Sequence, residues 1–280
     1  MTDTKKRKNR ITIKDVARAA NVSIATVSYV LNNKEGQTIS EETRKKILQF
    51  ANLLGYECNV MAKYLATGRT NTVTVIVKDC APFASQYYLR MITELSRLLD
   101  KQHLNLRIND YGDGMKNGSD CDAYITIALS EREFRLFADT KYVPVIAIDS
   151  ALEDFLFYRI TDDYAAAAKA ARAEHPDRKI ALLTFELPEE VTAVARKCFD
   201  EVKTVAKLDD IAALDRSAHY VTYSSSIFDN AVLRLDAELL SDSPRLKAEA
   251  AVHAAVKAIS RRPASSEEHR IEVRRNPAES

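Results

Sequence analysis

The stretch TIKDVARAANVSIATVSYVLN, residues 12–32, predicts two short helices joined by a tight turn. Thr12 precedes Asp15 by three residues, which is the spacing of a capping box, so we expect the first helix to begin near Ile13. Asn21 tolerates the left-handed backbone conformation that ends such a helix, and Ser23 is suited to cap the second. Each helix has one apolar face, formed by Val16, Ala17 and Ala20 in the first and by Val27, Val30 and Leu31 in the second.

A third helix is expected to start at Ser40, with Glu41 and Glu42 in its first turn. Gly55 is a natural end for this helix. Its apolar residues recur at helical spacing and form one buried stripe: Ile47, Phe50, Ala51 and Leu54. Three short helices around a small apolar core are what a helix-turn-helix head requires, and we assign residues 1–58 to it.

The charge of the chain is unevenly distributed. Residues 1–70 carry 13 Lys and Arg against 6 Asp and Glu, a net of +7, whereas the remaining 210 residues carry 28 against 34, a net of −6. A basic head on a mildly acidic body is typical of a module that binds a polyanion, attached to a body that does not.

Composition excludes several classes of protein. A hydrophobic fraction of 46% and a charged fraction of 29% are those of a soluble globular protein. The N-terminus lacks an apolar signal-peptide core, and no apolar run is long enough to span a bilayer, so we expect a cytoplasmic protein with no membrane partner. The four cysteines and five histidines show no metal-ligand spacing; buried free thiols, no metal and no cofactor are expected.

Residues 22–32 fit the pattern VSxxTVSxxLN at every fixed position, and on this ground the head resembles that of the lactose-repressor family of bacterial regulators. In such a head the second helix enters the major groove of double-stranded DNA. The resemblance assigns contacts with the DNA backbone to Thr12, Ser23, Thr26, Ser28 and Asn32, and base reading to Ile24, Ala25 and Tyr29. The family usually has arginine at position 29, so we expect an operator that depends less on guanine contacts.

The segment NVMAKYLATGR, residues 59–69, resembles the hinge helix of the same family. Asn59 is suited to cap it and Gly68 to end it, and we assign residues 59–70 to the hinge. The resemblance implies that it orders on DNA beside its twin from a second subunit, with Leu65 wedged into the minor groove and with Asn59, Lys63 and Ala66 also contacting DNA. It therefore implies a homodimer on a palindromic operator. An ordinary linker whose Leu65 packs on the body is the alternative.

Residues 71–280 alternate apolar runs with helical stretches, which favours parallel β-sheets flanked by helices. The strands are expected at 73–77, 104–108, 123–129, 143–148, 179–185 and 219–223. The order resembles the α/β, two-lobed, periplasmic-binding-protein-like effector domain of the same family. The resemblance places lobe 1 at about 71–160 plus 262–280 and lobe 2 at about 161–261, with a closing helix and strand near the C-terminus.

The body departs from the family pattern in three ways. It is several tens of residues shorter, mainly after Val232, where a strand and an Asp-bearing loop normally lie. The segment SSSIFDN, residues 224–230, replaces an Asn-Asp motif. All six glycines lie at or before Gly118, although turns around a ligand commonly use glycine. The candidate effector-binding residues are Asp79, Asp149, Asp163 and Arg196, each of which has an alternative interpretation as a helix cap or a surface ion pair.

The resemblance implies a sequence-specific transcription regulator, most often a repressor, whose affinity for DNA is modulated by a sugar-like effector. A DNA binder with a degenerate ligand site, independent of an effector or controlled by a partner protein, is the second interpretation. An α/β enzyme with an accessory DNA-binding head is a remote third, because the sequence contains no GxSxG, P-loop, GxGxxG or HExxH motif. No catalytic residue is assigned.

Overall fold

The computed structural model describes residues 11–31, 38–56, 69–115, 120–152, 154, 156–261 and 269–274. The chain divides into two units, Met1–Gly68 and Arg69–Ser280, which we call the head and the body. Among the described helices, none combines the length and the apolar character needed to cross a membrane.

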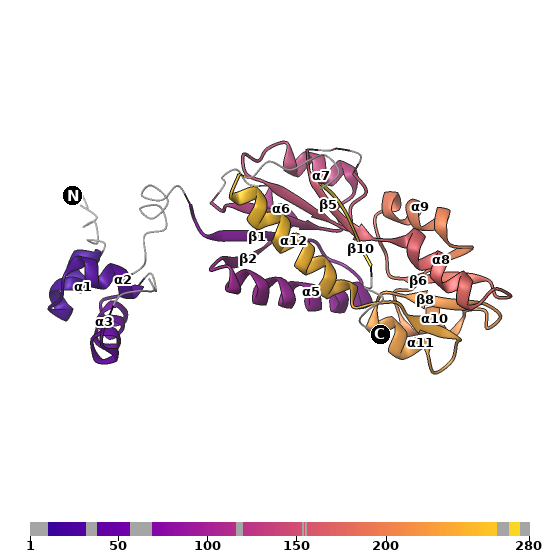
Figure 1. Ribbon diagram of the computed structural model, residues 1–280, viewed down its shortest axis with the longest axis horizontal. Helices are drawn as coiled ribbons and strands as arrows, with labels where there is room; N and C mark the ends of the chain where they lie inside the picture. Colours follow the sequence, from indigo (N-terminus) through magenta and orange to yellow (C-terminus); the bar gives the residue numbers. More distant parts are fainter. Residues whose placement is uncertain are drawn as a thin grey trace, which may run out of the picture. The chain divides into compact units, whose positions relative to one another are not determined.

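The head contains three helices, α1 (Ile13–Ala20), α2 (Ile24–Leu31) and α3 (Glu41–Leu53), drawn in indigo in Figure 1. The expected helix starts are confirmed to within a residue. Seven buried side chains from all three helices form its core: Val16, Ala17, Ala20, Val27, Val30, Ile47 and Ala51. A core this small contributes little burial, so the caps that fix the helix ends contribute a large share of its stability.

The first lobe of the body is a six-stranded sheet in the order β10-β5-β4-β3-β1-β2, in which every described pair is parallel. Its strands are β1 (Thr72–Val77), β2 (Asn105–Asp110), β3 (Ala123–Ile127), β4 (Val145–Ile148), β5 (Tyr158–Asp162) and β10 (Arg270–Val273). Helices α5 (Pro82–Lys101), α6 (Tyr111–Gly114) and α7 (Glu131–Ala138) connect them. The four strands predicted here and the C-terminal strand are confirmed, whereas β5 was not predicted because its sequence YRITD has only two apolar residues, Tyr158 and Ile160.

The second lobe is a four-stranded parallel sheet in the order β7-β6-β8-β9. It comprises β6 (Ile180–Thr184), β7 (Glu201–Thr204), β8 (His219–Thr222) and β9 (Ala237–Leu239), with helices α8 (Tyr164–Glu174), α9 (Glu189–Cys198), α10 (Leu208–Ala212) and α11 (Ser225–Ala231). The amphipathic pattern of residues 191–202 predicts one helix, but α9 ends at Cys198 and residues 201–204 form β7. Asp200 accepts a hydrogen bond from the backbone N–H of Ile180 (2.9 Å) and so starts β7 beside β6. The segment after Val232 retains a strand, the three-residue β9.

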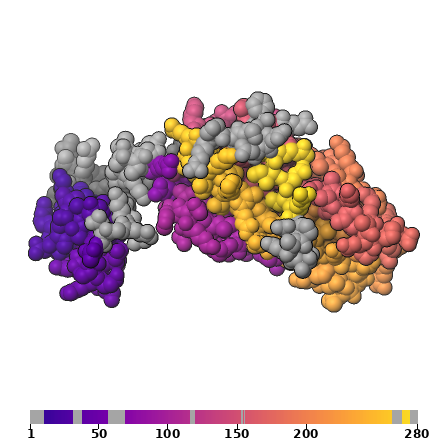
Figure 2. All heavy atoms as spheres, viewed as in Figure 1, coloured from indigo at the N-terminus to yellow at the C-terminus, as the bar shows by residue number. Residues whose placement is uncertain are grey.

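The last helix, α12 (Ser243–Ile259), packs on the first lobe, against α5, β3, β4, β5 and β10. Figure 1 shows α12 running alongside α5, and Figure 2 shows the two segments adjacent on the visible face. The assignment of residues 161–261 to lobe 2 is therefore wrong for this helix. Its Ala-rich buried face needs an apolar partner, which α5 and the larger sheet provide.

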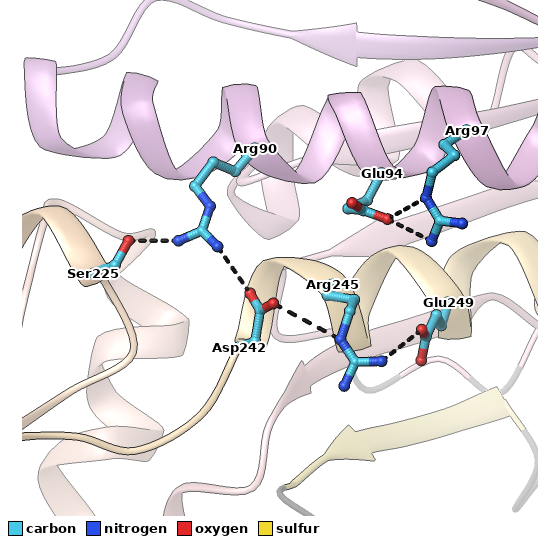
Figure 3. A network of polar contacts seen from close by, with 7 residues as sticks. All are labelled: Arg90, Glu94, Arg97, Ser225, Asp242, Arg245 and Glu249. Carbon is cyan, nitrogen blue, oxygen red and sulfur yellow. Dashed lines mark hydrogen bonds and ion pairs between the residues drawn. The ribbon is translucent and has the colours of Figure 1, made fainter.

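An exposed polar network on α5, α11 and α12 connects the two lobes (Figure 3). The guanidinium of Arg90 donates to Ser225 Oγ (2.5 Å) and to Asp242 Oδ1 (3.4 Å). Arg245 lies 3.7 Å from the other oxygen of Asp242 and donates to Glu249 (3.0 Å). Ser225 belongs to the SSSIFDN segment, so part of that segment holds the lobes together. Exposed pairs of this kind contribute about 0–1 kcal/mol each.

Candidate nucleic-acid interface and interlobe cleft

The first helix of the head begins at a capping box. Asp15 Oδ2 accepts hydrogen bonds from the backbone N–H (2.9 Å) and from the hydroxyl (2.7 Å) of Thr12. These two bonds hold the pKa of Asp15 below its ordinary value. The box fixes Thr12 at the exposed amino end of α1, where backbone N–H groups favour a phosphate.

The turn between α1 and α2 uses the two residues expected for it. Asn21 adopts the left-handed conformation (φ 56°, ψ 49°), and Ser23 Oγ accepts a hydrogen bond from the backbone N–H of Thr26 (3.0 Å). The hydroxyls of Ser23 and Thr26 lie 2.8 Å apart. These local bonds set the direction in which α2 leaves the turn.

Helix α2 has one face in the core and one face outward. Val27 and Val30 are buried, whereas the side chain of Ile24 is 45% exposed and Ala25 is also exposed. Thr26, Ser28 and Tyr29 are half-buried. The first two turns of α2 thus present an outward face with two apolar groups and several hydroxyls. Five further predicted DNA-contacting residues lie outside the described residues: Asn32, Asn59, Lys63, Leu65 and Ala66.

In the body, a cleft of about 620 Å³ lies at the carboxyl ends of β1 and β3 in one lobe and of β6 in the other. The sheet order changes direction between β1 and β3, and ligands of open α/β sheets bind at such a switch point. Two of the predicted effector residues, Asp79 and Arg196, line this cleft from opposite lobes. Arg196 pairs with Glu189 of its own helix.

The predicted residue Asp149 does not line the open cleft. It is fully buried behind it, in a space of about 10 Å³ that is enclosed by side chains of both lobes. The ammonium of Lys247, on α12, lies 2.5 Å from Asp149 Oδ1 and 2.6 Å from Asp162 Oδ2. It also donates to Tyr87 Oη (3.1 Å), and Ser243 donates to Asp162 (2.5 Å). A side chain of this protein therefore occupies the position beside Asp149.

The charge of Lys247 is retained despite its burial. Desolvation lowers the pKa of Lys247, but the charges of Asp149 and Asp162 outweigh it and hold the pKa well above its ordinary value. With two carboxylates and one ammonium, removal of Lys247 alone would leave two buried negative charges without a counterion. Removal of one partner from a buried ion pair costs about 3–5 kcal/mol.

The fourth predicted effector residue, Asp163, is a helix cap. Its carboxylate accepts a hydrogen bond from the backbone N–H of Ala166 (2.9 Å) at the start of α8, and it lines a different groove from the cleft. The structure thus brings together two of the four predicted residues, buries the third and uses the fourth as a cap.

Sequence reasoning missed Lys247, Asp162 and Tyr87. One signal was available, since Lys247 falls on the same helical face as the small residues Ala248, Ala251 and Ala255, where a lysine is out of place. The expectation of buried thiols was also only partly correct among the described cysteines. Cys121 is buried, Cys198 is half-buried, and Cys80 is exposed in the cleft wall.

Two residues at the cleft end of the first sheet adopt left-handed backbone conformations without being glycine. Ala128 has φ 51° and Asp149 has φ 52°. For a residue such as alanine this conformation costs about 1–2 kcal/mol. The absence of glycine after Gly118 therefore did not remove the left-handed turns from the described strand ends.

The head is similar to a known family of regulatory proteins. Residues 12–59 match the family model described as bacterial regulatory proteins, lacI family. RegA, an HTH-type transcriptional regulator of Clostridium acetobutylicum, is 30% identical over 176 residues, which are 56% of this chain and 49% of that protein. GalS of Salmonella typhimurium, another such regulator, is 36% identical over 141 residues, 46% of this chain and 40% of its own length. The chain thus spans about half or less of the curated relatives it matches.

Two solved structures share the fold over nearly the whole chain. The lac repressor dimer bound to operator and the anti-inducer ONPF superposes with a TM-score of 0.63 at 14% identity, covering 94% of this chain and 96% of that chain. A complex of the transcriptional regulator CelR with cellobiose gives 0.54 at 16% identity, covering 94% and 97%. The head of this chain thus matches the lacI family model, and the body shares the two-lobed α/β fold of these two structures.

Proposed function

We propose that the chain is a sequence-specific DNA-binding transcription regulator, of the repressor type, that binds a palindromic operator as a homodimer. The observation that carries this proposal is the outward face of α2 on a capped helix-turn-helix head that matches the lacI family model. A regulator of this kind works where the chromosome lies, in the bacterial cytoplasm. A homodimer is supported by the lac repressor, a relative in fold that was solved as a dimer on operator.

In this proposal the residues of the head divide into two groups. Thr12, Ser23, Thr26 and Ser28 contact phosphates and set the register of the head on the duplex, together with Asn32. Ile24, Ala25 and Tyr29 meet base edges in the major groove. The hinge residues Asn59, Lys63, Leu65 and Ala66 would add contacts in the minor groove between the half-sites.

The test is selection of bound sites from random duplex DNA by the purified full chain at fixed salt. We expect an inverted repeat whose half-sites depend on the outward face of α2. The exposed apolar residues Ile24 and Leu48 form a matched pair, since they are 45% and 47% exposed on α2 and α3. The substitution Ile24→Asn should change the selected half-site, while Leu48→Asn should leave it unchanged. Selection of no common sequence, or equal effects of both variants, would contradict the proposal.

A second form of this function is a regulator whose DNA binding is independent of a sugar-like effector. The observation that favours it is Lys247, whose ammonium neutralises Asp149 and fills the space beside it. An effector would be confined to the open part of the cleft, between Asp79 and Arg196. Control by a partner protein is compatible with the same closed site.

Calorimetry of the full chain against a panel of sugars and nucleotides separates the two forms. If no ligand saturates, and operator affinity does not change with any of them, the effector-independent form is supported. One ligand that saturates at micromolar concentration and shifts operator affinity would exclude it. Turnover of any member of the panel would instead support the enzyme interpretation.

A further inference from the structure

Four residues with metal-binding side chains gather in the second lobe, at the end of its sheet opposite the cleft. His175 follows α8, His219 is the first residue of β8, Asp236 precedes β9 and Glu238 lies within β9. The sequence spacing of these residues matches no metal motif, and the parallel pairing of β8 with β9 and with β6 brings them together.

The centre of the cluster is the ring of His219, which is only 3% exposed. Neither of its ring nitrogens makes a well-aligned hydrogen bond with a described residue. Buried polar atoms of this kind need a partner, and an ion is one of the partners that satisfy them. The ring of His175 stacks on it, with centroids 3.8 Å apart and planes at 25°.

The two nitrogens of His219 face different carboxylates. Nδ1 lies 3.1 Å from Asp236 Oδ2, and Nε2 lies 3.7 Å from Glu238 Oε2. The first distance allows a hydrogen bond after a small rotation of the ring. The second is too long for a hydrogen bond but is close to the roughly 3.3–3.6 Å that separates two ligands of one tetrahedral zinc ion.

Asp236 therefore has the position of an outer-shell carboxylate rather than of a ligand. In zinc sites, a histidine ligand commonly donates its second ring N–H to a carboxylate, which fixes the tautomer that binds the metal. Asp236 also lies 3.3 Å from the guanidinium of Arg178, which donates to the carbonyls of Ser217 and Ala218 and so is held in place. That cation reduces the affinity of Asp236 for a metal and leaves it available to orient His219.

We propose that His175, His219 and Glu238 bind one divalent transition-metal ion of the zinc type, with Asp236 orienting His219. One ligand atom from each of the three residues lies within 4.8 Å of the other two. His219 Nε2 and Glu238 Oε2 are already near the separation of two zinc ligands, whereas the pairs that lie furthest apart must close by about 1 Å. Because an imidazole binds a metal in the plane of its ring, His175 must also turn out of its stack on His219. His175 and Glu238 are half-buried side chains that can move in this way, while His219 stays fixed.

Two imidazoles and one carboxylate favour zinc over magnesium or calcium, which prefer oxygen ligands. Water would complete the coordination, because no fourth protein ligand is included. The ion would tie the turn after α8 to β8 and β9 and so stabilise the second lobe. This inference does not rest on the proposed function in DNA binding.

The test uses the untagged full chain, stripped of metal with a chelator and then titrated with ZnCl2 in a calorimeter. We expect one Zn²⁺ per chain, an increase in Tm, and intense visible absorption when Co²⁺ replaces Zn²⁺. His175→Ala and Glu238→Gln, both at half-buried positions, should lower the affinity at least tenfold. Asp236→Asn should lower it by about 10–100-fold, as expected for an outer-shell partner.

The matched control is His253→Ala, which removes an exposed histidine from α12 and should leave zinc binding unchanged. Circular dichroism of each variant without metal checks that it folds. Substoichiometric binding, binding that His175→Ala does not weaken, or an equal response to Mg²⁺ would overturn the proposal.

Discussion

The head and the body differ in how well each residue suits its local conformation. Among the described residues of the head, the left-handed positions are Asn21 and Gly55, residue types that adopt this conformation readily. In the body, Ala128, a residue type that rarely adopts it, holds the same conformation at the cleft, and Lys247 lies on a buried helix face. Neighbours in sequence therefore determine the conformation of the head, whereas contacts distant in sequence impose the conformation around the cleft.

The largest effect is expected from the substitution Lys247→Met. It should lower the free energy of unfolding of the body by about 3–5 kcal/mol, because Asp149 and Asp162 would remain buried without their counterion. Urea unfolding followed by circular dichroism measures it. Adding Asp149→Asn and Asp162→Asn to this variant should restore most of the loss, and Lys169→Met, at an exposed position of α8, is the control. A loss of less than 1 kcal/mol would mean that the three charges are not coupled.

The corresponding substitution in the head is Tyr29→Ala. It should weaken binding to the selected operator by about 1–3 kcal/mol per half-site, the range found for the loss of a base contact, while leaving the unfolding of the body unchanged. Fluorescence anisotropy with labelled operator measures the affinity. An equal loss on random DNA would show instead that Tyr29 contacts the DNA backbone.

A substitution at Ala128, the left-handed position at the cleft, should change the free energy of unfolding by a smaller amount and in the opposite direction. Ala128→Gly should raise the free energy of unfolding by about 0.5–1 kcal/mol, because glycine adopts φ near 50° without the steric penalty of Cβ. The same substitution at the exposed helical position Ala170 should lower it by about 1 kcal/mol. Chemical denaturation of both variants provides the comparison, and effects of the same sign would contradict the backbone assignment.

The smallest effect is expected from pH. The hydrogen bond from the backbone of Ile180 and the bond from Arg172 hold the pKa of Asp200 below its ordinary value. Its stabilising contribution is therefore complete above the unfolded-state pKa of about 4 and is lost as the pH falls through the lower folded-state pKa. Asp200→Asn should flatten the acid limb of the stability curve by less than about 1 kcal/mol, since the pair is exposed. Thermal unfolding between pH 3 and about pH 7 tests this, with Asp177→Asn as the control.

The parts of the fold that the sequence predicted share a physical property. Each of the six predicted strand segments contains at least three apolar residues, although β2 has no fully buried one, and each helix start in the head has a polar side chain that bonds within three residues of it. The strands that were missed, β5, β7 and β9, are short and contain at most two apolar residues each, so no apolar run marks them. Their pairing with β4, β6 and β8 defines them.

The roles of the residues around the candidate cleft were less predictable, because they also depend on contacts distant in sequence. Asp163 precedes a helix and was a plausible cap from sequence alone, whereas its neighbour Asp162 is a buried partner of Lys247. Nothing in the sequence near either aspartate distinguishes the two roles. The distinction depends on α12, which follows much later in the chain and packs on the first lobe.

The three helices of the head, their caps and the outward position of Ile24 and Ala25 could be predicted from the sequence alone, because these features depend on bonds between near neighbours. It also determined the parallel α/β character of the body. By contrast, the position of Lys247 beside Asp149 and the stacking of His175 on His219 could not be predicted from the sequence. Both depend on the packing of separate elements, which brings charged and metal-binding side chains together in an interior where their interactions are stronger than in water.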